Sequence, residues 1–216
     1  GTGGAYEALW RAQQKGACLT CAPRLLLCAR TGDILTVVME YVDGPTLAQA
    51  VARQGGSIAY ARAVFPLLCH AAEELHQAPE APIIHRDLKP SNIVISENGP
   101  VIIDFGIARE WREGAEADTS HFGTRCYAPP EQFGFGQTDI RSDVYALGKI
   151  LFFCLTGSNP ANVATAEMLA EAGVPPACAR VIARATAFDP ATRYGDARQL
   201  ALAAGIAFEK DLQQAS

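Results

Sequence analysis

One feature constrains this chain more than any other: the run His85-Arg86-Asp87-Leu88-Lys89-Pro90-Ser91-Asn92, followed later by Asp104-Phe105-Gly106. Short β-branched stretches at 93–95 and 101–103 lie between the two motifs, so both motifs are predicted in loops at strand ends. Together they carry two carboxylates, one amide and one ammonium. Carboxylate and amide oxygens are the hard ligands that Mg²⁺ prefers. The spacing suits transfer of a phosphoryl group from Mg-ATP, which depends on positioning and charge neutralisation.

The run H-R-D-L-K-P-S-N with the later D-F-G resembles the catalytic loop and metal-binding motif of eukaryotic-type (Hanks-type) serine/threonine protein kinases. The resemblance implies ATP and Mg²⁺ as cofactors, Asp87 as the catalytic base, and Asn92 and Asp104 as ligands of the metal. It also implies that Lys89 contacts the transferred phosphate, a pattern that tyrosine kinases usually lack. A lone aspartate in a loop is usually a cap or a solvated charge, and a lone lysine a surface residue. The matching neighbours favour the catalytic interpretation.

Residues 39–42, M-E-Y-V, resemble the hinge between the two lobes of the family. The resemblance places Met39 beside the adenine and Val94 beneath the ring. The backbone C=O of Glu40 and the backbone N–H of Val42 would pair with the adenine edge. A plain edge strand is the alternative interpretation of this segment.

The polar segment 107–127 resembles an activation loop. Arg86 would receive a phosphate on this loop, and Thr119 and Ser120 are the candidate phosphorylation sites. Thr124 would shape the site of the substrate hydroxyl. The segment leads into A-P-P-E, a form of the A-P-E motif that bacterial members often have. This motif favours a protein substrate over the small substrates of aminoglycoside or choline kinases.

Three further residues are predicted to have structural roles. The resemblance pairs Glu131 of A-P-P-E with Arg193 in a buried ion pair, which is costly to break from one side. Asp143 heads an apolar helical segment, where a carboxylate is favoured by the helix dipole. In the family it also holds the backbone of the catalytic loop.

The family also uses a glycine-rich loop over the phosphates and a strand lysine paired with a helix glutamate. Neither the loop nor the lysine is found among these residues, and Glu7 is the best candidate for the glutamate. The resemblance covers about residues 5–205. Three explanations stay open: a fragment of a longer kinase, a natural truncated kinase (pseudokinase) that binds nucleotide or a regulatory partner, and an unusual active enzyme. A pure protein-binding module is a further alternative.

Composition narrows the remaining choices. The chain has 216 residues, 49% hydrophobic and 19% charged, which is typical of a soluble globular domain. A net charge of −5 without a basic block disfavours nucleic acid as a partner. No apolar run is long enough to span a membrane, and the N-terminal residues lack the pattern of a signal peptide, so we expect cytoplasmic residence. The 7 cysteines include one C-x-x-C pair, but reduced thiols are favoured over structural zinc.

Hydrophobic periodicity and turn signals predict an α+β chain, with a small strand-containing region followed by a mainly helical body. The family resemblance implies the protein-kinase-like fold, mainly its α-helical C-lobe with a truncated N-lobe. The predicted division is a small N-terminal part with the hinge, residues 1–42, and a helical part, residues 43–216. The predicted strands are 24–28, 34–42, 93–95 and 101–103. The predicted helices are 5–15, 46–53, 57–77, 142–156, 164–171, 176–187 and 196–210.

Overall fold

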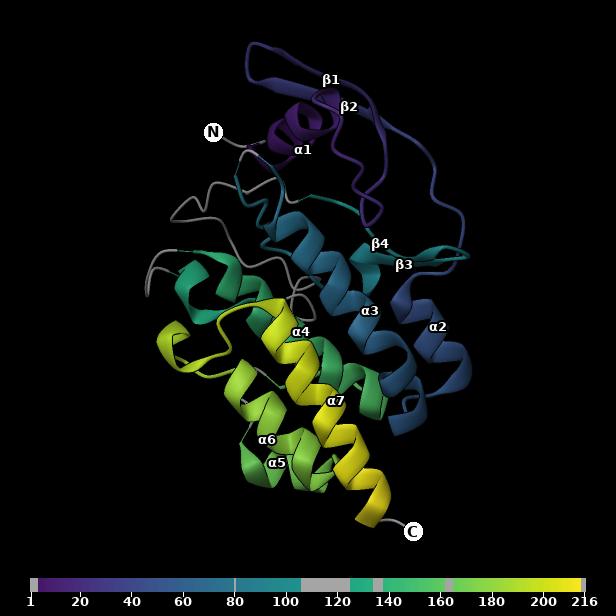
Figure 1. The fold of residues 1–216 in the computed structure, drawn as a ribbon, viewed down its shortest axis with the longest axis vertical. Helices are drawn as coiled ribbons and strands as arrows, with labels where there is room; N and C mark the ends of the chain where they lie inside the picture. Colours follow the sequence, from purple (N-terminus) through teal and green to yellow (C-terminus); the bar gives the residue numbers. More distant parts are fainter. Residues whose placement is uncertain (1–3, 80, 106–124, 134–137, 162–164, 215–216) are drawn as a thin grey trace, which may run out of the picture.

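A computed structural model describes residues 4–79, 81–105, 125–133, 138–161 and 165–214. Its N-terminal part contains helix α1 (Gly4–Gln14) and an antiparallel hairpin of β1 (Leu25–Thr31) and β2 (Ile34–Met39). These elements form one end of the molecule in Figure 1, and the other helices form the opposite end. The predicted strand 34–42 was too long, since β2 ends at Met39 and the chain then runs on without regular structure.

Helices α2 (Leu47–Gln54) and α3 (Ile58–His76) begin at side chains that cap them. Thr46 and Gln49 form a reciprocal capping box, and the hydroxyl of Ser57 accepts from the N–H of Tyr60. Helix α3 continues through Pro66 to His76. The two helices predicted over 46–53 and 57–77 are therefore confirmed almost to the residue.

A second antiparallel hairpin consists of β3 (Ile93–Ser96) and β4 (Gly99–Ile102), with Glu97 and Asn98 in its turn. A single turn of 3₁₀ helix, η1 (Pro90–Asn92), leads directly into β3. This hairpin lies between the N-terminal elements and the helical end in Figure 1. The predicted pair of strands is confirmed, with ends shifted by one or two residues.

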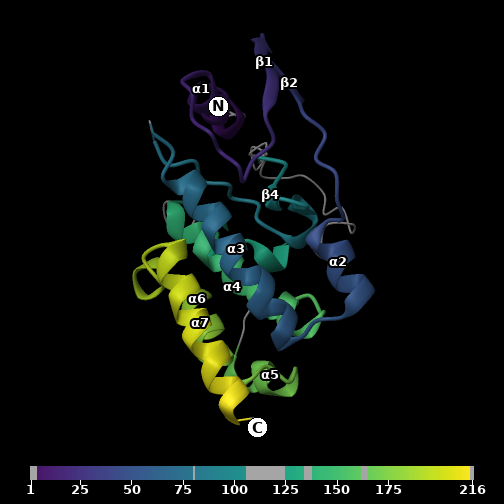
Figure 2. The ribbon, with the colours of Figure 1, turned by 45° about the vertical axis from the view of Figure 1, so that its right-hand side comes forward.

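Helix α4 (Ile140–Thr156) is the centre of the helical part and is buried along almost its whole length. Helices α3, α6 (Pro176–Ala185) and α7 (Ala197–Gln214) pack against it, and Figure 2 shows α3, α4 and α7 running side by side. Helix α5 (Ala166–Glu171) packs on α6. Short 3₁₀ turns η3 (Arg125–Tyr127), η4 (Pro130–Phe133) and η5 (Pro190–Thr192) complete the described elements.

The hydrophobic core runs without interruption from Leu9 of α1 to Phe208 of α7. All seven cysteines are free thiols, and most of them are buried. In the described part of the chain, no group of three or more His, Cys, Asp and Glu side chains is arranged to hold a metal ion. Within the same residues, none of the helices has the length and apolar character needed to cross a bilayer.

Candidate active site

The loop between α3 and β3 brings three of the predicted catalytic side chains together. Asp87 Oδ2 accepts from the ammonium of Lys89 at 2.7 Å and from the amide of Asn92 at 3.1 Å. The same amide of Asn92 donates to the backbone oxygen of Asp87 at 3.0 Å, so the buried Asn92 closes the loop on itself. The Asp87 side chain is 37% exposed, and its Oδ1 has no hydrogen-bond partner among the described residues. One carboxylate oxygen is thus held, and the other is left without a hydrogen bond from the described residues.

The two predicted metal ligands lie at the same end of the second hairpin. Asn92 immediately precedes β3, and its backbone oxygen accepts from the N–H of Ile103 at 2.9 Å. Asp104 follows Ile103 and has an exposed side chain. Its φ of 58° lies in the left-handed region, which is uncommon for residues other than glycine and costs about 1–3 kcal/mol. The hairpin register therefore brings the two predicted ligands to the same end of the hairpin, with Asp104 in a strained conformation.

A column of rings connects this loop to the N-terminal part. The imidazole of His85 lies 5.1 Å from the ring of Phe105, which lies 5.8 Å from Tyr6 of α1. His85 Nε2 contacts the oxygen of Ile103 at 3.0 Å, and His85 Nδ1 accepts from the N–H of Asp87. Only a neutral ring protonated at Nε2 satisfies both contacts. Burial, which lowers the pKa of His85, favours the same form.

Acidification should destabilise the fold through this histidine. Its stabilising contribution is full above the unfolded pKa of about 6.5, and is lost as the pH falls from there through the lower folded pKa. We expect the free energy of unfolding, measured with urea, to be smaller at about pH 5.5 than at about pH 7.5. His85→Gln should flatten this dependence, whereas His70→Gln, at an exposed site on α3, should leave it unchanged. Equal slopes in the wild type and His85→Gln would contradict the assignment.

Asp143, near the start of α4, holds the backbone of the loop that contains Asp87. Its two oxygens accept from the backbone N–H groups of His85 and Arg86, each at 2.9 Å. The imidazole of His76 lies 2.8 Å from the same carboxylate, and both side chains are almost fully buried. Burial alone would raise the pKa of Asp143, but the hydrogen bond and charge of His76 outweigh it, and the pKa lies below its usual value. No sequence pattern pointed to His76, which ends a helix with an apolar face.

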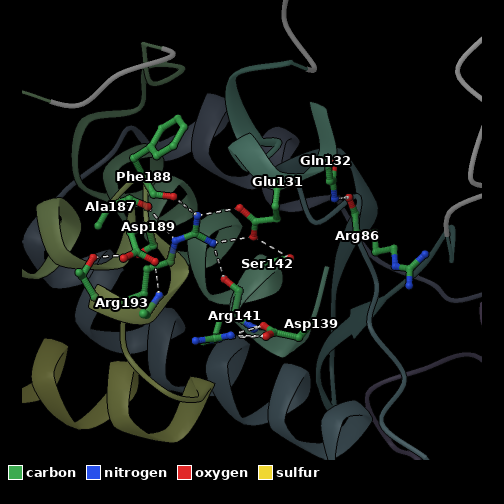
Figure 3. A network of polar contacts seen from close by, with 12 residues as sticks. Arg86, Glu131, Gln132, Asp139, Arg141, Ser142, Ala187, Phe188, Asp189 and Arg193 are labelled. Carbon is green, nitrogen blue, oxygen red and sulfur yellow. Dashed lines mark hydrogen bonds and ion pairs between the residues drawn. The ribbon is translucent and has the colours of Figure 1, made fainter. Parts of the chain in front are cut away.

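The predicted pair of Glu131 and Arg193 is present and is bidentate, with distances of 2.7 and 2.8 Å (Figure 3). Both side chains are fully or nearly fully buried. Arg193 also donates to the backbone oxygens of Ala187, Phe188 and Arg141. Burial would raise the pKa of Glu131, but the hydrogen bonds from Arg193 and Ser142 hold it below its usual value.

The residues that follow the predicted hinge lie against the second hairpin. The oxygen of Pro45 accepts from the N–H of Ile95, and Thr46 pairs with the buried Val94. Gly44 has a φ of 139°, and a Cβ there would lie 2.4 Å from the oxygen of Ile95. Only glycine allows this approach. The structure thus brings Val94 next to the chain that follows Met39 and Val42.

The remaining predicted residues are not part of this cluster. Glu7 pairs with Arg30 of β1 at 2.9 Å, in a partly exposed ion pair that lowers its pKa. The side chain of Arg86 is exposed and points away from the network of Glu131 in Figure 3. Thr119, Ser120 and Thr124 lie outside the described residues.

Comparison with known proteins supports the same family from sequence and from fold. Residues 24–193 match the family model described as Protein kinase domain. The serine/threonine-protein kinase PknB of Mycolicibacterium smegmatis is 38% identical over 78% of this chain and 30% of its own length. The serine/threonine-protein kinase PknL of Mycobacterium tuberculosis is 36% identical over 74% of this chain and 44% of its own length. The chain therefore spans less than half of these curated relatives.

The fold is similar to crystal structures of the kinase domain of Mycobacterium tuberculosis PknI. A double mutant superposes with a TM-score of 0.70 at 22% identity, covering 94% of this chain and 79% of the other. The unmutated domain gives a TM-score of 0.66 over 94% of this chain. The predicted fold class, mainly the helical lobe with a small few-stranded N-terminal part, is confirmed.

Proposed function

This chain belongs to the protein kinase family, of the bacterial serine/threonine type, and on that premise we propose that it transfers the γ-phosphoryl group of ATP to a serine or threonine hydroxyl of a protein. The observation that carries the proposal is the arrangement of Asp87. One of its oxygens is fixed by Lys89 and Asn92, and the other has no hydrogen-bond partner among the described residues, on a side chain that is 37% exposed. A base must be held in this way while remaining open to the proton that it accepts.

In the proposed reaction, Asp87 Oδ1 accepts the proton of the attacking hydroxyl. The ammonium of Lys89 lies beside that carboxylate, and turning it toward the transferred group would stabilise negative charge on the phosphoryl oxygens. Asn92 keeps the loop closed through both of its contacts with Asp87. Little covalent chemistry is required of the protein, because catalysis in this reaction rests on positioning and charge.

Asn92 and Asp104 fit a hard metal ion. Asp104 offers an exposed carboxylate, and among the described residues Asn92 Oδ1 accepts a hydrogen bond only from the hydroxyl of Ser91, at 3.3 Å. Mg²⁺ is commonly held by one or two such side chains together with phosphate oxygens and water. Bound Mg-ATP supplies the phosphoryl group and neutralises its charge. The strained backbone conformation of Asp104 supports a functional role for this residue.

The adenine is proposed to bind at the hinge. The N–H of Glu40 is already used by the oxygen of Arg24 at 2.9 Å. Among the described residues, neither the C=O of Glu40 nor the N–H of Val42 has a partner, so one acceptor and one donor are available. Met39 is partly buried beside them and Val94 is buried on β3. We propose that the division between residues 1–42 and 43–216 falls at this segment.

We also propose roles in regulation and in substrate placement for the other predicted residues. Arg86 has a guanidinium directed away from the ion-pair network, where it could bind a phosphate on Thr119 or Ser120. Thr124 would lie near the substrate hydroxyl, and Glu7 remains the candidate helix glutamate. Glu131, Asp143 and Arg193 would hold the scaffold.

Binding of Mg-ATP tests the proposal most directly. Adding Mg-ATP should raise the melting temperature of the chain, because a ligand that binds only the folded state stabilises it. Asp104→Asn should lose most of this shift, while Asp33→Asn, in an exposed turn, should keep it. A shift that survives in Asp104→Asn would contradict the metal assignment. No shift in the wild type, together with a co-purifying protein, would favour a partner-binding module instead.

A further inference from the structure

The peptide unit that precedes Asp87 is held from both of its ends. Its N–H, on Asp87, donates to His85 Nδ1 at 3.3 Å. Its C=O, on Arg86, accepts from the side-chain amide of Gln132 at 2.6 Å. Arg86 has a φ of 66°, one of two positive values at described residues other than glycine. Such a backbone persists only where its surroundings fix it.

Gln132 reaches Arg86 from an anchored position. It lies in η4 directly after Glu131, whose carboxylate is fixed by two bonds from Arg193 and one from Ser142. Figure 3 shows the Gln132 amide beside the backbone oxygen of Arg86, with the guanidinium of Arg86 directed elsewhere. A contact through the backbone oxygen does not depend on the side chain of Arg86.

We propose that Gln132 is a positioning residue for phosphoryl transfer, which fixes the Arg86–Asp87 peptide unit and thereby the direction of the Asp87 carboxylate. This inference rests on the proposed kinase activity. Asp143 holds the N–H of Arg86, so this residue is fixed on one side by α4 and on the other by η4. A single side-chain amide, that of Gln132, thereby connects the end of the A-P-P-E segment to the backbone next to Asp87. Small misplacements of a reacting group cost large factors in rate.

Three substitutions separate positioning from packing. Gln132→Met keeps the length of the side chain and removes the donor, Gln132→Lys restores a donor of similar reach, and Gln132→Glu places an acceptor against the oxygen of Arg86. We expect kcat to fall at least about tenfold in Gln132→Met, with the KM for ATP within about twofold of the wild type. The order of kcat should be wild type, then Lys, then Met, then Glu. Gln199→Met, in an exposed turn of α7, is the matched control and should behave as the wild type.

A measurement independent of activity is the chemical shift of the Asp87 amide nitrogen by NMR, because this atom shares the peptide unit with the oxygen of Arg86. Relative to the wild type, this chemical shift should change in Gln132→Met and should remain the same in Gln199→Met. An unmoved Asp87 amide, an unchanged kcat, or a Lys variant as slow as the Met variant would overturn the proposal. If the wild type transfers no phosphate, the proposed function fails, and the NMR comparison alone decides whether Gln132 positions Asp87.

Discussion

Replacing Asp87 with asparagine should lower the rate of phosphoryl transfer by about 10²- to 10⁴-fold, the usual contribution of a general base. Asparagine has nearly the same shape and keeps an oxygen that can accept from Lys89 and Asn92 at the present distances of 2.7 and 3.1 Å. It cannot take up the proton of the attacking hydroxyl. The fold and the nucleotide site should therefore persist while the chemical step is lost.

The measurement is transfer of labelled γ-phosphate from ATP to a generic protein acceptor such as casein, with the melting-temperature shift by Mg-ATP recorded in parallel. Asp87→Asn should keep that shift, and Asp104→Asn should lose it. This contrast separates the base from the metal ligand. If Asp87→Asn transferred phosphate at the wild-type rate, Asp87 would not be the base, and another carboxylate would have to take that role.

Local sequence signals predicted most of the helices because the caps act over three residues. Thr46 and Gln49 form their box within α2, and Ser57 caps α3, so both starting points could be found from the sequence alone. Helix ends were less predictable. Helix α7 runs to Gln214, beyond the predicted end at 210, and Asp211 in this extension accepts from the first N–H groups of α6. That capping contact joins residues more than thirty positions apart, which no local pattern reveals.

The contacts of the candidate site also divide into local ones, which follow from sequence spacing, and long-range ones, which depend on packing. Asp87, Lys89 and Asn92 meet within one short loop, so their proximity follows from spacing. The partnership of His76 with Asp143 spans 67 positions and exists only because α3 packs against α4. The pair of Glu131 and Arg193 was predicted through the family resemblance and not from the chemistry of the residues.

Lys149 shows what an all-round apolar helix can hide. The sequence predicted an apolar helix over 142–156, and Lys149 lies in the middle of it with no exposed surface. Its ammonium donates to the oxygen of Ala161 at 2.7 Å and lies 5.4 Å from the ring of Tyr145. Burial lowers its pKa to about 8. The charged residue is visible in the sequence. What the sequence does not reveal is that the backbone oxygen of Ala161 lies close enough to accept from the ammonium and so reduce the cost of burying it.

Removing Arg193 should have the largest effect on stability. Arg193→Met leaves the carboxylate of Glu131 buried without its cation, and breaking a buried pair from one side costs about 3–5 kcal/mol. The three backbone oxygens that Arg193 now binds would also lose their donor. The free energy of unfolding, obtained from urea denaturation, should fall by that amount, and η4 with Gln132 should lose its anchor.

The surface pair of Arg62 and Glu209 is a matched control, because its side chains are 54% and 57% exposed at a distance of 2.7 Å. Arg62→Met should change the free energy of unfolding by less than about 1 kcal/mol, since exposed pairs contribute little. Replacing Glu131 and Arg193 together by methionine should cost less than the sum of the two single changes, because neither partner is then left charged in the core. If the losses in free energy of unfolding were additive in this cycle, the two side chains would stabilise the fold independently. The ion pair would then not hold the A-P-P-E segment to the helical part.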